Sequence, residues 1–109
     1  MNEQTQPILT LLREVPLFSG LTIEELERLS EEFIMVELPK GEMLYRIQEV
    51  TDGLFVIDTG QLELLDEDGK QLEVLKHGEV VGTEALNYLP ARQKTVMALT
   101  DSRVYFLPN

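Results

Sequence analysis

From residue 34 onward, the chain carries apolar residues in short, near-alternating runs that are separated by turn residues. Alternation places every second side chain on the same face of an extended chain, so each run predicts a half-buried β-strand. The runs read IMVEL, EMLYRI, LFVID, QLELL, QLEVL, KTVMAL and RVYFL, and the segments between them include PKG, DTG, DEDGK and KHGE. Short strands at such regular spacing predict a mainly β fold, a sandwich or a jelly-roll-type β-roll of about eight strands.

Two stretches add detail to this β pattern. Asp68-Gly69 lies between QLELL and QLEVL and indicates a hairpin, because glycine tolerates a positive φ. Residues 82–89, GTEALNYL, break the β rhythm, and we expect a short helix there.

The first 33 residues show a helical rather than an alternating period. Pro7 suits the first turn of a short helix, because its missing N–H costs nothing there. The T-I-E-E pattern that starts at Thr22 is a capping box, in which Glu25 can reach back to the Thr22 backbone. It predicts an amphipathic helix over residues 23–33.

The length of 109 residues suits one compact domain and is too short for two. We therefore expect a single domain over residues 1–109, in which a helical part (1–33) precedes a β-roll (34–109).

The charge balance restricts the partners of this domain. There are 9 basic and 20 acidic residues, which gives a net charge of -11. Such a field repels nucleic-acid backbones and anionic membranes, so we expect no direct nucleic-acid binding. The sequence has no cysteine, no signal-peptide pattern and no apolar run long enough to span a bilayer, which predicts a cytoplasmic protein without membrane insertion.

Catalytic and metal sites find little support. His77 is the only histidine, so neither a metal-dependent jelly-roll enzyme nor a serine nucleophile with a histidine base can be assembled. DEDG at residues 66–69 lacks the further ligands of a calcium loop, since Leu64 and Leu75 stand where ligands are needed. We expect no enzyme activity and no resident cofactor or metal.

Residues 82–96, GTEALNYLPARQKTV, hold a lone arginine ten positions after a glycine. Gly82 permits a tight approach of the backbone, and a following helical turn offers N–H groups to an anion. Arg92 adds a planar fork of donors that suits phosphate oxygens. These features fit a pocket for one small phosphate. The more ordinary alternative is that Arg92 pairs with one of the many surface carboxylates.

The order of these motifs resembles the cyclic nucleotide-binding domain family over nearly the whole chain. PLFSGLTIEELERLSEEF is similar to the helical opening of the family, and LPKGEMLYR, DGLFVIDTGQLELL and LEVLKHGEVVG are similar to its glycine-punctuated strands. Residues 82–96 then stand where the family has its phosphate-binding cassette. The interval from Gly82 to Arg92, the Ala85-Leu86 pair and Thr95-Val96 all match typical cassettes.

The resemblance implies that Arg92 contacts the cyclic phosphate of cAMP or cGMP, with help from backbone N–H groups near Ala85 and Gln93. Gly82 would let the chain pass close to the ribose. The expected ligand-binding residues are Gly82, Thr83, Glu84, Ala85, Leu86, Arg92, Gln93 and Thr95.

Several positions depart from the family pattern. Thr83 stands where the family has the glutamate that accepts the ribose 2′-hydroxyl, and Glu84 follows one place later. One residue on a helix turns a side chain by about 100°, so Glu84 cannot simply take over that role. Gln93 and Lys94 are longer than usual, and Gln48 replaces a glycine, so we expect Gly53 to supply the flexibility of that turn.

Family members continue into helices that cover the base and pass on the signal. Because the sequence ends with RVYFLPN, we expect such lid helices to be absent here. The leading hypothesis is therefore a regulatory module that binds a cyclic nucleotide and signals to an output domain outside the chain. The alternative is a degenerate fold that binds no nucleotide and serves in protein interaction or as a homodimer.

Overall fold

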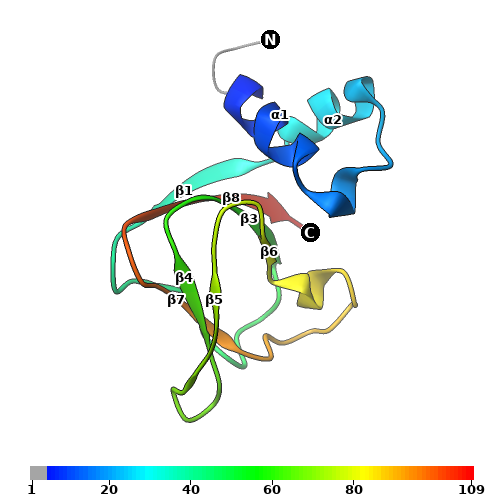
Figure 1. Ribbon diagram of the computed structural model, residues 1–109. Coiled ribbons are helices and arrows are strands. Elements are labelled where there is room, and N and C mark those ends of the chain that lie inside the picture. The colour runs from blue at the N-terminus through cyan, green and yellow to red at the C-terminus, as the bar shows by residue number, and fades with distance from the viewer. Residues whose placement is uncertain (1–4) are drawn as a thin grey trace.

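The computed structural model describes residues 5–109, in which a small helical part precedes a roll of two β-sheets (Figure 1). The helical elements are α1 (Thr5–Arg13), the 3-10 turn η1 (Pro16–Phe18), α2 (Ile23–Ser30) and the 3-10 turn η2 (Thr83–Ala85). The strands are β1 (Ile34–Leu38), β2 (Met43–Tyr45), β3 (Gly53–Thr59), β4 (Leu62–Leu65), β5 (Gln71–Leu75), β6 (Val80–Val81), β7 (Thr95–Ala98) and β8 (Ser102–Pro108). The chain is mainly β, as the alternating pattern predicts.

Within residues 5–109, eight strands form two four-stranded antiparallel sheets. One sheet has the order β1-β8-β3-β6 and the other β2-β7-β4-β5. The apolar side chains between them come from both sheets, and they form one core. Its buried members are Leu38, Tyr45, Phe55, Ile57, Leu62, Leu75, Val81, Val96, Ala98 and Val104.

The helices cover the outer face of the first sheet. β3 is buried on both of its faces, which explains its continuous apolar run GLFVI. Phe55 and Ile57 point into the core between the sheets, whereas Leu54 and Val56 pack against the helical part. The apolar residues of α1 that bury themselves there are Ile8, Leu9, Leu11 and Leu12. Figure 1 shows both helices on this side of the roll, away from the β4–β5 hairpin.

The predicted capping box is present, but the helix that follows is shorter than expected. The Thr22 side chain accepts a hydrogen bond from Glu25 N at 3.1 Å, and the Glu25 carboxylate accepts one from Thr22 N at 2.9 Å. α2 ends at Ser30, three residues before the predicted end. Phe33 is buried after the helix, where its ring packs edge-on against Phe18.

The turn that starts at Gln48 uses two residues with positive φ. Gln48 itself adopts the left-handed conformation, with φ of 79°, and Gly53 at the end of the turn has φ of 153°, which non-glycine residues rarely adopt. Gly53 has another role, because a Cβ atom there would lie only 2.2 Å from the Leu107 carbonyl oxygen on β8. The absence of a side chain at Gly53 is what allows these two strands to pair so closely.

Candidate functional site

Arg92 is held in place by backbone pairing between two loops. Its N–H donates to Glu49 O at 2.8 Å, and its carbonyl accepts from Gln48 N at 2.9 Å. A bridge between Val50 and Ala91 continues this pairing. The segment before β7 is therefore tied to the loop between β2 and β3, which turns the Arg92 side chain into the roll.

The guanidinium of Arg92 is almost completely buried, with 1% of the residue exposed. Nη1 donates to Gly82 O at 3.2 Å and to Glu84 Oε1 at 3.3 Å. Nη2 donates to Asp52 Oδ1 at 2.9 Å and to Gly53 O at 2.7 Å. Nε is also buried and has no hydrogen-bond acceptor among the described residues.

Aromatic rings support the same guanidinium. Its central carbon lies 4.2 Å from the centre of the Tyr45 ring and 5.8 Å from that of Phe55, which are distances typical of cation–π contacts. Burial raises the pKa of the Tyr45 hydroxyl, and the nearby Glu84 carboxylate raises it further, while Arg92 opposes the shift. Tyr45 therefore stays neutral beside the cation.

Gly82 is the residue that makes room for Arg92. Its φ of 87° is left-handed, and a Cβ atom added there would lie 2.6 Å from Arg92 Nη1. Any side chain at this position would be strained and would also collide with the guanidinium. Gly82 therefore lies against Arg92, and the passage of the backbone close to a ribose stays a prediction.

The turn after Gly82 places two neighbouring side chains in opposite environments. Thr83 is exposed, whereas Glu84 is buried. Glu84 Oε2 accepts a hydrogen bond from Gln93 N at 2.8 Å, while its Oε1 faces Arg92 Nη1. The short helix predicted here is the single 3-10 turn η2, in which Ala85 N donates to Gly82 O at 3.2 Å.

The remaining predicted site residues lie around this centre. Leu86 is exposed on the turn, and the Gln93 side chain is exposed and donates to Ala91 O. Thr95 is buried, and its hydroxyl accepts a hydrogen bond from Ile47 N at 2.9 Å, so it fixes β7 to the end of β2.

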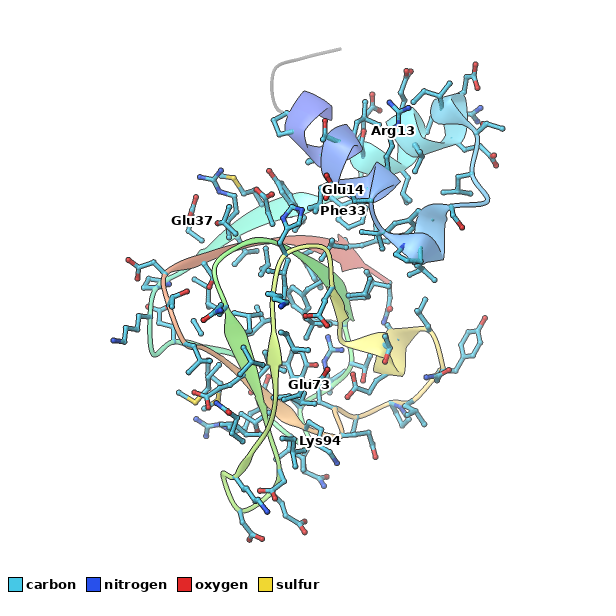
Figure 2. The ribbon with its side chains drawn as sticks, in the orientation of Figure 1. Arg13, Glu14, Phe33, Glu37, Glu73 and Lys94 are labelled. Carbon is cyan, nitrogen blue, oxygen red and sulfur yellow. The ribbon has the colours of Figure 1, made fainter. Side chains whose placement is uncertain are left out.

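A cavity of about 290 Å³ opens beside Arg92. It is lined by Ile47, Gln48, Asp66, Glu67, Arg92, Gln93 and Lys94. Figure 2 shows Lys94 on the side of the roll that faces away from the helices. The cavity thus lies between the predicted cassette and the tip of the β4–β5 hairpin. The cassette contributes the cations Arg92 and Lys94 to its lining, and the hairpin contributes the carboxylates of Asp66 and Glu67.

Some residues of the centre carry no signal in the sequence that would identify them. Asp52 lies 40 positions from Arg92 in sequence, and Tyr45 lies on a different strand. Their contacts arise only once the two loops pair. A buried arginine needs such partners, but the burial of Arg92 is itself visible only in the structure.

Two further features of the described residues bear on function. Over residues 5–109, no cluster of three or more histidine, aspartate or glutamate side chains is arranged to hold a metal ion. Within the same range, no helix is both long and apolar enough to cross a bilayer.

Most of the chain, including the residues around Arg92, matches a known protein family. Residues 35–109 match the family described as "Cyclic nucleotide-binding domain". An uncharacterised NTE family protein of Mycobacterium tuberculosis is 27% identical over 96 residues, which cover 88% of this chain and 16% of that protein. The chain therefore spans only a small part of the curated relatives that it matches.

Solved structures of regulatory proteins share the fold. cAMP-bound PfPKA-R is 32% identical, with a TM-score of 0.86 over 99% of this chain and 40% of that one. The regulatory subunit of a cAMP-independent protein kinase A from Trypanosoma brucei is 26% identical, with a TM-score of 0.87 over 96% of this chain and 39% of that one. With the family match over residues 35–109 and this shared architecture, the chain belongs to the cyclic nucleotide-binding domain family.

Proposed function

We propose that this chain is a cytoplasmic regulatory module that binds cAMP or cGMP and anchors the cyclic phosphate at Arg92. The observation that carries the proposal is the burial of the Arg92 guanidinium next to the cavity, with Nε still without an acceptor among the described residues. A buried cation with an unused donor can accept an anion, and burial strengthens the attraction. The likeness to cAMP-bound PfPKA-R supports the same ligand class.

The predicted ligand residues divide into three groups under this proposal. Arg92 and the backbone N–H groups of Ala85 and Gln93 would face the phosphate. Gly82 would let the backbone pass close to the ribose. The side chains of Thr83, Glu84, Leu86 and Thr95 would shape the surroundings, and none of them repeats the ribose contact of the family glutamate.

Signalling would follow from competition between ligand contacts and internal contacts. A phosphate that displaces the Arg92 side chain would also displace the loop that carries Asp52, because Arg92 Nη2 lies 2.9 Å from the Asp52 carboxylate. Binding would thereby shift the balance between two arrangements of the cassette and this loop, and an output domain outside the chain would read the difference.

A second candidate function is a protein-interaction or dimerisation module that binds no nucleotide. Two observations favour it. Four carboxylates, those of Asp52, Asp66, Glu67 and Glu84, lie around the cavity or on Arg92 and oppose an anionic ligand. Large apolar side chains are also exposed near the cassette: Val50, Leu86, Tyr88 and Leu89. The similar T. brucei structure is described as the regulatory subunit of a cAMP-independent protein kinase A, which supports this candidate.

Isothermal titration calorimetry with cAMP and cGMP separates the two candidates. The nucleotide proposal expects saturable heat with one site per chain. It also expects Arg92→Lys to weaken binding roughly tenfold to hundredfold, since a bidentate charged contact is replaced by a point charge. Circular dichroism confirms that the variant is folded. No saturable heat at millimolar concentrations of either nucleotide would favour the interaction module.

A further inference from the structure

Glu84 is a carboxylate inside the anion site itself. Only 8% of the residue is exposed, and its two oxygens face two different donors. Oε1 lies 3.3 Å from Arg92 Nη1, and Oε2 accepts the Gln93 N–H at 2.8 Å. A guanidinium and a neighbouring backbone N–H that converge on one point make an anion-binding site, and the Glu84 carboxylate is the anion that fills it.

The geometry of the turn explains why Glu84 rather than Thr83 points inward. Gly82 holds a left-handed φ of 87°, which reverses the chain directly before these two residues. Thr83 is then exposed, and the next side chain faces the roll. Burial of a carboxylate is unfavourable unless it is paired and hydrogen-bonded, so the contacts to Arg92 and Gln93 are what keep Glu84 inside.

An incoming phosphate needs the same donors. Arg92 Nη1 is taken by Glu84 and Gly82, and Nη2 by Asp52 and Gly53, which leaves Nε as the free donor among the described residues. Asp52 is a weak competitor, because its side chain is 68% exposed and can rotate into water. The Glu84 side chain is only 11% exposed, and it occupies the Gln93 N–H as well as Arg92 Nη1. Glu84 is therefore the stronger competitor of the two carboxylates.

We propose that the Glu84 carboxylate is a built-in competitor of the ligand phosphate, so that a nucleotide binds only by displacing it from Arg92 and Gln93. The proposal rests on Arg92 being the phosphate anchor. A group attached to the same turn acts at a high effective concentration, so it sets a threshold below which a free ligand does not bind. Glu84 thereby determines the ligand concentration to which the module responds.

The variant that tests this is Glu84→Gln, which keeps the size of the side chain and an oxygen for the Gln93 N–H but removes the charge. Glu49→Gln is the matched control, because Glu49 is exposed, lies on the adjoining loop and carries the same charge. Dissociation constants for cAMP and cGMP are measured by calorimetry at one fixed salt concentration. Inorganic phosphate is titrated separately, and the Gln93 amide signal is followed by NMR.

Glu84→Gln is expected to bind nucleotide roughly tenfold to hundredfold more tightly than the unmodified chain, the range expected for loss of one charged competitor. Glu49→Gln should change the affinity less than about threefold, as expected for an exposed charge at that salt concentration. Equal affinities of the unmodified chain and Glu84→Gln would overturn the role of Glu84 and leave nucleotide binding intact.

The phosphate titration keeps the two proposals apart when no nucleotide binds. If inorganic phosphate shifts the Gln93 amide signal of Glu84→Gln but not that of the unmodified chain, the competitor role holds and the nucleotide proposal fails. If neither phosphate nor nucleotide binds to a folded Glu84→Gln, the competitor role is overturned as well. Thermal unfolding followed by circular dichroism shows whether the variant is folded.

Discussion

A Cβ atom on Gly82 would stand 2.6 Å from Nη1 of Arg92, so the glycine and the arginine ten positions later occupy adjoining space inside the roll. The interval between these two residues indicates the cassette in the sequence. In the structure, the absence of a side chain at Gly82 leaves the space that the Arg92 guanidinium fills. Gly82 supplies a carbonyl for the guanidinium as well as the room that it occupies.

Gly82→Ala is expected to destabilise the protein by more than a change of backbone conformation alone. The left-handed conformation costs a non-glycine residue about 1–2 kcal/mol, and the collision with Arg92 adds to it. Gly69→Ala is the matched control, because Gly69 has φ of 81° but open space around its Cβ position. The free energy of unfolding from urea titration should fall further for Gly82→Ala. Equal losses would mean that Arg92 moves aside freely.

Arg92→Met should lower the free energy of unfolding by about 3–5 kcal/mol, since removal of one partner of a buried pair leaves Glu84 without its counter-charge. The double variant Arg92→Met, Glu84→Leu removes both charges and should recover a substantial part of this loss. Urea titration of the two variants makes the comparison. A double variant no more stable than Arg92→Met would show that Glu84 is not the residue left unpaired.

A polar contact between the helical part and the roll involves His77, and this contact should make stability depend on pH. His77 Nδ1 lies 2.6 Å from Asp58 O and Nε2 lies 2.5 Å from Glu14 Oε2. Both partners are acceptors, so only the charged ring can donate to both. Figure 2 shows Glu14 where α1 approaches the roll. The hydrogen bond to Asp58 O and the one to Glu14 raise the pKa of His77 above its ordinary value of 6.5.

A raised pKa means that the folded protein binds this proton more tightly than the unfolded chain does. The stabilisation is therefore complete below the ordinary histidine pKa and is lost as the pH rises through the folded-state pKa. Because both side chains are about half exposed, a double-mutant cycle with His77→Gln and Glu14→Gln should give a coupling of about 0.2–1 kcal/mol at pH 5.5 and less at pH 8.5. A coupling that grows with pH would contradict the charged pair.

Thr22→Ala should cost about 1 kcal/mol of stability, because the side chain that accepts the Glu25 N–H at the start of α2 is lost. Thr22→Ser, which retains the hydroxyl, should stay close to the unmodified chain. Thermal unfolding of the three proteins decides the matter. Equal losses for serine and alanine would assign the effect to the methyl group instead.

The strands were predictable from sequence because alternation reports directly on which face of a strand is buried. β6 has only two residues, Val80 and Val81, which is too short for an alternating pattern to emerge. The helical spacing extends three residues beyond the observed end of α2, because Phe33 continues that spacing while serving as a core residue after the helix. Gln48 shows that a left-handed turn can be kept without the glycine that normally indicates it.

The candidate site was predictable only in part. The interval from Gly82 to Arg92 located the centre, but the contacts of Arg92 depend on pairing between two loops that are distant in sequence. With 20 acidic residues available, nothing in the sequence identifies Asp52 and Glu84 as its partners. The sequence shows that Glu84 stands one position after the glutamate that binds the ribose in the family. That its carboxylate instead contacts Arg92 and the Gln93 N–H depends on the backbone conformation of Gly82, which the sequence does not show.

Nucleotide binding at Arg92 is tested most directly by the backbone amide signal of Gln93 during titration with cAMP and cGMP, because this N–H lies in the site and donates to Glu84. A nucleotide site at Arg92 with Glu84 as competitor predicts a saturable shift in the unmodified chain. The same shift should occur in Glu84→Gln at a ligand concentration at least roughly tenfold lower. An amide signal that does not move at millimolar nucleotide in either protein would contradict a cyclic nucleotide site at Arg92.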